Sequence, residues 1–201
     1  MVLGTGTASY LWNHVALSLL EPGRDDHEDG DGRGDREYRH GFRGSRTLLR
    51  NARVLATLDI AIADAAIGCW DAKYTYNFWR PITAIRETAD DGNEGSAPDP
   101  TWTPLFATPA HPDYPSGHSC VSGAATAVLA NEFGERTHFD ITSDLLLGVT
   151  RSFRSFTDAL EEVKNARIFS GIHFRTACDD GTTLGKEVAE YVLAHNFQRV
   201  R

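Results

Sequence analysis

The sequence predicts an all-α protein, a helical bundle in which strands are scarce. Apolar residues recur at intervals of three and four through much of the 201-residue chain, which is the spacing of one helix face. Alternation of apolar and polar residues, the pattern of a half-buried strand, is rare. Several segments are also rich in alanine, the strongest helix former. We expect the functional site to lie between helices and at a helix N-terminus.

Composition limits the classes of partner. A hydrophobic content of 41% suits a globular core, and the net charge of −8 argues against nucleic acid as a partner. No apolar run approaches the roughly 20 residues of a membrane span, and residues 1–20 lack the basic region of a secretory signal. We therefore expect a soluble protein whose compartment is unknown. The three cysteines are widely spaced and are expected to be reduced.

Three segments differ in composition. Residues 1–20 are expected to form an N-terminal helical segment in which Trp12 anchors the core. Residues 21–46 are nearly all Gly, Asp, Glu, Arg and His, which predicts a flexible insertion because so little apolar surface can be buried. Residues 47–201 are expected to form the helical domain that carries the site.

Within that domain the first helix is predicted over 47–70, and its apolar pattern, which includes Leu48 and Leu49, is expected to be buried. Pro81 should end or kink any helix that carries the preceding residues. Residues 90–112 hold many Gly, Pro and Asp, which predicts a long loop that shapes a site.

Further helices are predicted over 141–156, from an N-cap at Asp158 to Phe169, and over 183–197. The last of these helices is expected to bury Leu184, Val188, Tyr191 and Val192.

The stretch Pro115-Ser116-Gly117-His118 opens another predicted helix. Free N–H groups and the positive end of the dipole at such an opening favour an anion. His118 would lie beside that anion and could transfer a proton near neutral pH. His111 and Asp113 could form a metal site with His118, but their spacing matches no compact ligand pattern.

Two basic clusters flank this opening in the sequence. Lys73 and Arg80 are seven residues apart, which would place them on nearly the same face of a helix. A solvated helix face is the simpler interpretation, although the aromatic residues around the pair argue against it. Arg167 and His173 would point about 120° apart on an unbroken helix, so they can share a site only if the helix turns near Ser170-Gly171.

In order, the motifs K-x6-R-P, P-S-G-H and R-x5-H resemble the signature of one superfamily. It unites type 2 phosphatidic acid phosphatases, bacterial acid phosphatases and vanadium-dependent haloperoxidases. The resemblance spans Trp70 to Arg175. It implies that His173 is the phosphate nucleophile or the apical ligand of vanadium, and that His118 is the acid/base. It also implies that phosphate or vanadate is bound by Lys73, Arg80, Ser116, Gly117 and Arg167.

The residues around Trp70 and Phe78-Trp79-Arg80-Pro81 resemble soluble haloperoxidases more than membrane lipid phosphatases. In that branch Trp70 lines the halide region. The position of His111 is typically Phe in chloroperoxidases and His in bromoperoxidases. The resemblance thus implies a vanadate cofactor and oxidation of bromide or iodide by hydrogen peroxide.

Two other functions stay open. A soluble acid phosphatase would act on a small phosphate ester through a phosphohistidine at His173, and a phosphate- or vanadate-binding protein would have low activity. The chain also departs from the pattern: Ala166 replaces a usual serine, and we place no carboxylate partner for Arg167. The chain is short for a haloperoxidase, so we expect that the missing part is either truncated or supplied by a second copy in a homo-oligomer.

Overall fold

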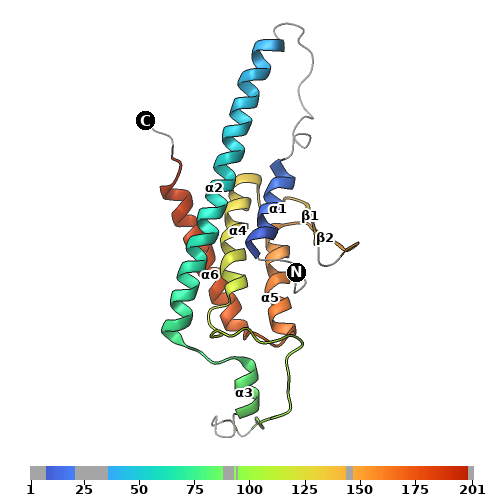
Figure 1. Cartoon of the computed structure of the whole chain (residues 1–201), viewed down its shortest axis with the longest axis vertical. Helices are drawn as coiled ribbons and strands as arrows, with labels where there is room; N and C mark the ends of the chain where they lie inside the picture. Colours follow the sequence, from blue (N-terminus) through green and yellow to red (C-terminus); the bar gives the residue numbers. More distant parts are fainter. Residues whose placement is uncertain (1–7, 21–35, 88–92, 94, 144–146, 199–201) are drawn as a thin grey trace.

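The structure is a computed structural model that describes the backbone of residues 8–20, 36–87, 93, 95–143 and 147–198, with side chains in the second helix from Thr47 onward. Long helices lie side by side and confirm the predicted all-α bundle (Figure 1). No described helix is long and apolar enough to cross a membrane. The helices are α1 (Ala8–Leu20), α2 (Arg36–Tyr76), α3 (Pro81–Glu87), α4 (Gly117–Phe133), α5 (Phe156–Phe169) and α6 (Arg175–His195).

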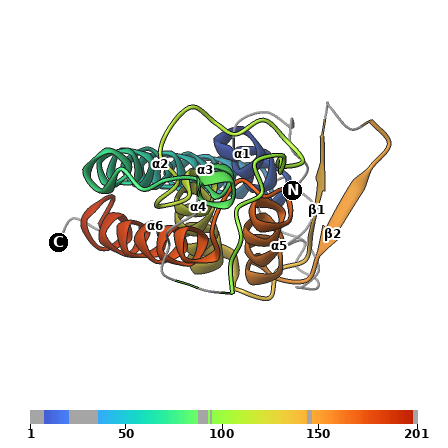
Figure 2. The ribbon, with the colours of Figure 1, turned by 90° about the horizontal axis from the view of Figure 1, so that it is seen from below.

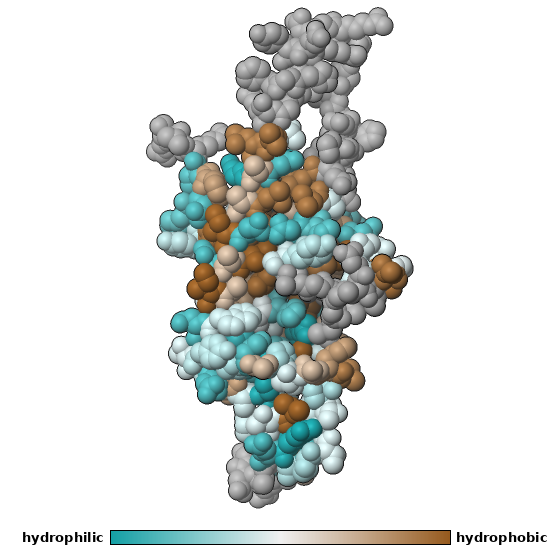
Figure 3. All heavy atoms as spheres, in the orientation of Figure 1, coloured by the Kyte–Doolittle hydropathy of each residue, from teal (hydrophilic) through white to brown (hydrophobic). Residues whose placement is uncertain are grey.

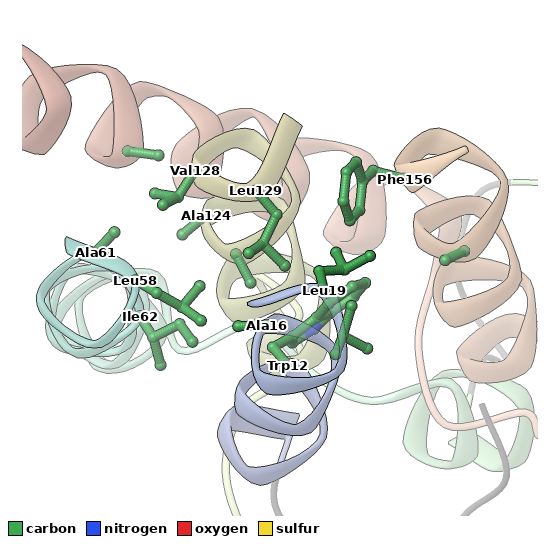
Figure 4. Close-up of a cluster of buried hydrophobic side chains, with 14 of the residues drawn as sticks. Trp12, Ala16, Leu19, Leu58, Ala61, Ile62, Ala124, Val128, Leu129 and Phe156 are labelled. Atoms are coloured by element: carbon green, nitrogen blue, oxygen red, sulfur yellow. The ribbon is translucent and has the colours of Figure 1, made fainter. Parts of the chain in front are cut away.

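The core forms around α4, which packs against α1, α2, α5 and α6. Figure 4 shows side chains of α1, α2 and α4 pointing toward one another, with Phe156 of α5 beside them. Trp12 is almost fully buried, and its Nε1–H donates to Ser122 Oγ at 3.0 Å, so its predicted role as a core anchor is confirmed. All three cysteines are free and buried, as expected.

Glycines allow α4 and α6 to approach closely. A Cβ on Gly185 would lie 2.1 Å from the carbonyl oxygen of Cys120, and one on Gly123 would lie 2.7 Å from that of Thr182. Only a residue without a side chain fits such contacts. The Ser116 N–H donates to the Ala177 carbonyl at 2.8 Å, which ties the start of α4 to the first turns of α6.

Helix α2 is longer than the sequence pattern indicates. It begins at Arg36, within the predicted flexible insertion of 21–46, of which 21–35 lie outside the described residues. A helix can extend beyond its apolar stretch, because each added residue adds one backbone hydrogen bond. Leu48 and Leu49 are exposed at 71% and 73%, and brown apolar surface is visible on the upper half of the molecule (Figure 3). The expectation that they are buried is wrong.

The predicted helix over 141–156 is wrong, because β1 (Phe139–Thr142) and β2 (Thr150–Phe153) form an antiparallel pair there. Phe139 pairs with Phe153 and stacks on Phe156 with ring centroids 5.0 Å apart. Val149, which the predicted helix would place on its apolar side, is 40% exposed, and the predicted partners Leu145 and Leu146 lie outside the described residues.

Two other helix boundaries differ from expectation. Ser155, not Asp158, is the N-cap of α5, and its Oγ accepts from the Asp158 N–H at 3.0 Å. Helix α6 begins at Arg175, well before the predicted start at residue 183. Tyr191 is 64% exposed, so only part of the predicted apolar face is buried.

Candidate functional site

The predicted site residues gather at one end of the bundle. Helices α2 and α5 end there and α4 and α6 begin there, at the lower end in Figure 1, and Figure 2 views the molecule from this end. Lys73 lies in the last turn of α2 and Arg167 in the last turn of α5. Arg80 directly precedes α3, and His173 lies between α5 and α6.

Lys73 is fully buried and is bonded to the loop before α4. Its Nζ donates to the carbonyl oxygens of Pro112 at 2.9 Å, Asp113 at 3.0 Å and Pro115 at 2.5 Å. An ammonium has three N–H donors, so this set uses all of them. Burial lowers the pKa of Lys73, and the charge of Arg80 acts in the same direction. Lys73 therefore fixes the loop and contributes a buried positive charge.

Arg80 connects two histidines. Its guanidinium donates to the carbonyl oxygens of His111 at 3.0 Å and Ile172 at 2.6 Å. It also lies 3.2 Å from His173 Nε2 and 3.1 Å from His111 Nδ1. The prediction that Lys73 and Arg80 share a helix face is wrong, because α2 ends at Tyr76 and Asn77 adopts a φ of 44°. A left-handed residue at this position is a common helix terminator.

The predicted helix opening at Gly117 is confirmed. Ser116 is the N-cap, and its buried Oγ makes no hydrogen bond to a described residue. A Cβ on Gly117 would lie 2.9 Å from the ring of Trp70, so glycine lets the indole approach the helix terminus. Burial lowers the pKa of His118 to about 3, helped by the charges of Arg167 and His173.

The predicted turn after α5 is also confirmed. The helix ends at Phe169, and Gly171 has a φ of 72°, which favours glycine. This turn brings His173 back against Arg80. Arg167 is 3% exposed, and its Nε has no hydrogen-bond partner among the described residues. Burial lowers the pKa of Arg167 to about 10, and none of the described carboxylates pairs with it.

The two residues of the predicted halide region lie together. The rings of Trp70 and His111 are 5.3 Å apart between centroids, and Trp70 lies 5.7 Å from Lys73 Nζ. Burial lowers the pKa of His111, and the charges of Lys73 and Arg80 lower it further. Trp70 is 41% exposed, which places this pair at the boundary between the buried charges and solvent.

The sequence interpretation overlooked the role of Asp113, which it considered only as a weak metal ligand. Asp113 is fully buried, with Oδ1 2.8 Å from His173 Nδ1 and 3.8 Å from Arg80 Nη1. In the described part of the chain, no three His, Cys, Asp or Glu side chains are arranged to hold a metal ion. An acidic residue between two prolines, directly before the helix opening, was the available signal.

The cluster has the chemistry of an oxyanion site. Lys73, Arg80 and Arg167 are three buried cations, whereas Asp113 is the carboxylate that contacts the cluster. Excess buried charge is costly unless a counter-charge and hydrogen bonds satisfy it. The unpaired Ser116 Oγ and Arg167 Nε are the donors that such an anion would use.

Comparisons with known proteins identify the family of the chain. The family model of the VCPO second helical-bundle domain matches residues 53–201. Vanadium chloroperoxidase of Curvularia inaequalis is 35% identical over 95 residues, which cover 42% of this chain and 15% of that protein.

Solved structures give the same result. The crystal structure of the first bacterial vanadium-dependent iodoperoxidase has a TM-score of 0.62 and 38% identity, over 72% of this chain and 33% of that one. An apo-type bacterial vanadium-dependent chloroperoxidase shares the fold, with a TM-score of 0.63 and 18% identity over 92% of this chain and 42% of that one. The chain thus spans well under half the length of these relatives. It belongs to the VCPO second helical-bundle domain family, in the haloperoxidase branch of the superfamily that its three motifs resemble.

Proposed function

We propose that this chain binds vanadate and oxidises bromide or iodide with hydrogen peroxide, as a vanadium-dependent haloperoxidase. The observation that carries the proposal is the buried group of Lys73, Arg80 and Arg167 around the N-terminus of α4. Relatives named as a vanadium chloroperoxidase and a vanadium-dependent iodoperoxidase support the reaction class. Because the chain covers only part of each, the activity is proposed here from its own residues.

The anion would be held from several directions. Arg80 and Arg167 supply guanidinium N–H groups, Ser116 supplies a hydroxyl, and Gly117 supplies a backbone N–H at the positive end of α4. Lys73 contributes charge and keeps the loop in place. Vanadate, when bound, supplies a Lewis-acidic centre that activates peroxide toward attack by a halide. His173 would be its protein ligand.

His118 is suited to move a proton. Burial and nearby charges lower the pKa of His118 to about 3, so its ring is neutral near pH 7 with a lone pair that could accept a proton. A pKa this low makes it a weak base, and a bound anion would raise the pKa by offsetting the charges of Arg167 and His173. Oxidation of one halide ion consumes one peroxide and one proton and gives hypohalous acid and water. A ring that accepts the peroxide proton and returns it to the departing oxygen serves both halves of this balance.

The halide would approach through the exposed side of the site. Trp70 and His111 form its partly exposed edge, and His111 contacts Arg80. A polar imidazole at this position, where the resemblance places Phe in chloroperoxidases, favours bromide or iodide over chloride.

A phosphatase is the second candidate, because the same residues would bind phosphate and His173 could attack it.

The haloperoxidase proposal is tested by measuring bromide oxidation with and without orthovanadate, and with and without hydrogen peroxide. We expect bromide oxidation only when orthovanadate and hydrogen peroxide are both present. The His173→Ala variant should lose activity by roughly a hundredfold or more, as for removal of a metal ligand or its support. His195→Ala, an exposed substitution at the end of α6, is the matched control.

Release of phosphate from p-nitrophenyl phosphate, inhibited by vanadate, would assign the phosphatase reaction instead. Phosphate that raises the melting temperature without either activity would leave a binding protein. Equal bromide oxidation in His173→Ala and His195→Ala would refute the site.

A further inference from the structure

We propose that Asp113 is a positioning residue that holds His173 as the tautomer protonated on Nδ1 and directs the unprotonated Nε2 at the oxyanion cluster. The inference rests on the proposed role of His173 as a ligand or nucleophile. It adds to that role the device that makes Nε2 available.

The tautomer follows from the partners on the two ring nitrogens. Asp113 Oδ1 lies 2.8 Å from Nδ1, a close contact that does not meet hydrogen-bond geometry in this structure, and a carboxylate oxygen favours an N–H over a lone pair at that nitrogen. Arg80 Nη1 lies 3.2 Å from Nε2, and a guanidinium can only donate. Both contacts favour one neutral form of His173, with the proton on Nδ1 and the lone pair on Nε2.

Asp113 is itself held firmly. Its N–H donates to the Phe78 carbonyl at 3.0 Å, and its own carbonyl accepts from Lys73 Nζ at 3.0 Å. The side chain is fully buried, and its Oδ1 is 3.8 Å from Arg80 Nη1. The carboxylate is therefore held in one place, and its closest contact is the imidazole of His173.

This arrangement has a direct chemical consequence. A nucleophilic or metal-binding imidazole needs an unprotonated nitrogen that faces its target, and the group bonded to the other nitrogen decides which one this is. If the ring of His173 were protonated on Nε2, its N–H would oppose the N–H of Arg80. Removing the carboxylate should therefore weaken anion binding through the wrong tautomer, even though Asp113 never contacts the anion.

The first test is made on the wild-type protein without vanadate. Long-range ¹H–¹⁵N spectra of histidine-labelled protein at pH 7.5, with His173 assigned from a His173→Gln spectrum, give the tautomer directly. We expect a protonated Nδ1 and an unprotonated Nε2. A protonated Nε2 would overturn the inference whatever the activity of the enzyme.

The second test compares variants. Asp113→Asn keeps the shape but removes the charge, and we expect a mixture of tautomers and a Kd for orthovanadate roughly 10- to 100-fold higher by calorimetry. The matched control is Asp180→Asn. It removes an exposed carboxylate of α6 that accepts a hydrogen bond at 2.9 Å from the hydroxyl of Tyr114, the neighbour of Asp113 in the loop before α4. The control should keep the wild-type spectrum and Kd.

An Asp113→Asn protein that is folded by circular dichroism and keeps both the wild-type tautomer and Kd would overturn the inference. If that variant does not fold, the wild-type spectrum still decides. If the wild-type protein shows the expected tautomer but does not oxidise halide, the proposed function is refuted and the pairing of Asp113 with His173 still holds.

Discussion

Acidification should destabilise this fold through the buried histidines of its site. Burial lowers the pKa of His173 to about 4, although Asp113 acts in the opposite direction, and lowers that of His118 to about 3. An unfolded chain returns both to the ordinary value of 6.5. Between the folded-state and unfolded-state pKa values of each histidine, the unfolded state binds more protons than the folded state. The stabilisation is therefore present above about pH 6.5 and is lost as the pH falls toward 4.

The magnitude follows from linkage. Each histidine that is neutral when folded and protonated when unfolded changes the free energy of unfolding by about 1.4 kcal/mol per pH unit. Between pH 7.5 and pH 5 this amounts to about 2 kcal/mol for His173, which is 5% exposed. His118 is less completely buried, so its contribution is at most the same.

Urea unfolding at half-unit steps from pH 7.5 to pH 5 measures this directly. The His118→Gln variant should reduce the slope between pH 6 and pH 5 by up to about 1.4 kcal/mol per unit. His195→Gln removes an exposed histidine from the end of α6 and should reproduce the wild-type slope. Equal slopes in wild type and His118→Gln would show that His118 is not held neutral by its surroundings.

Three further substitutions test the helix packing and the halide region. Gly185→Ala places a methyl group 2.1 Å from the Cys120 carbonyl oxygen, so we expect a loss of about 1–3 kcal/mol or more in urea unfolding. Gly68→Ala is also inside a helix, but its added methyl group has its nearest contact at 3.8 Å, so this variant should instead be more stable by up to about 1 kcal/mol. Similar losses of unfolding free energy in the two variants would refute the close approach of α4 and α6. His111→Phe should raise the rate ratio of chloride to bromide about tenfold, as for loss of one polar contact worth about 1.4 kcal/mol. An unchanged ratio in steady-state assays would remove His111 from the halide region.

The sequence predicted features that depend on local chemistry. The helix opening at Gly117 and the break at Gly171 follow from residues whose backbone preferences are strong. The burial of Trp12 follows from helical spacing alone. These features need no knowledge of what lies opposite them in space.

Predictions failed, or were not made, for features that depend on residues distant in the sequence. Phe139 and Phe153 form a strand pair because they pack with Phe156, whereas the intervening leucines imitate helical spacing. Asp113 became relevant only when the turn after α5 placed His173 beside it. A single sequence shows which side chains could pair, but the pairing itself depends on how the helix ends meet.

The direction of the helices explains why an anion site forms at this end of the bundle. A helix C-terminus carries partial negative charge and stabilises a cation by about 0.3–1 kcal/mol, and Lys73 and Arg167 lie in the last turns of α2 and α5. A helix N-terminus carries partial positive charge and free N–H groups, and α4 begins at the same end with Gly117. Antiparallel neighbours thus bring stabilised cations and free donors together. Turning either α2 or α5 end for end would separate them, so the charge of the site is a consequence of the topology as much as of its residues.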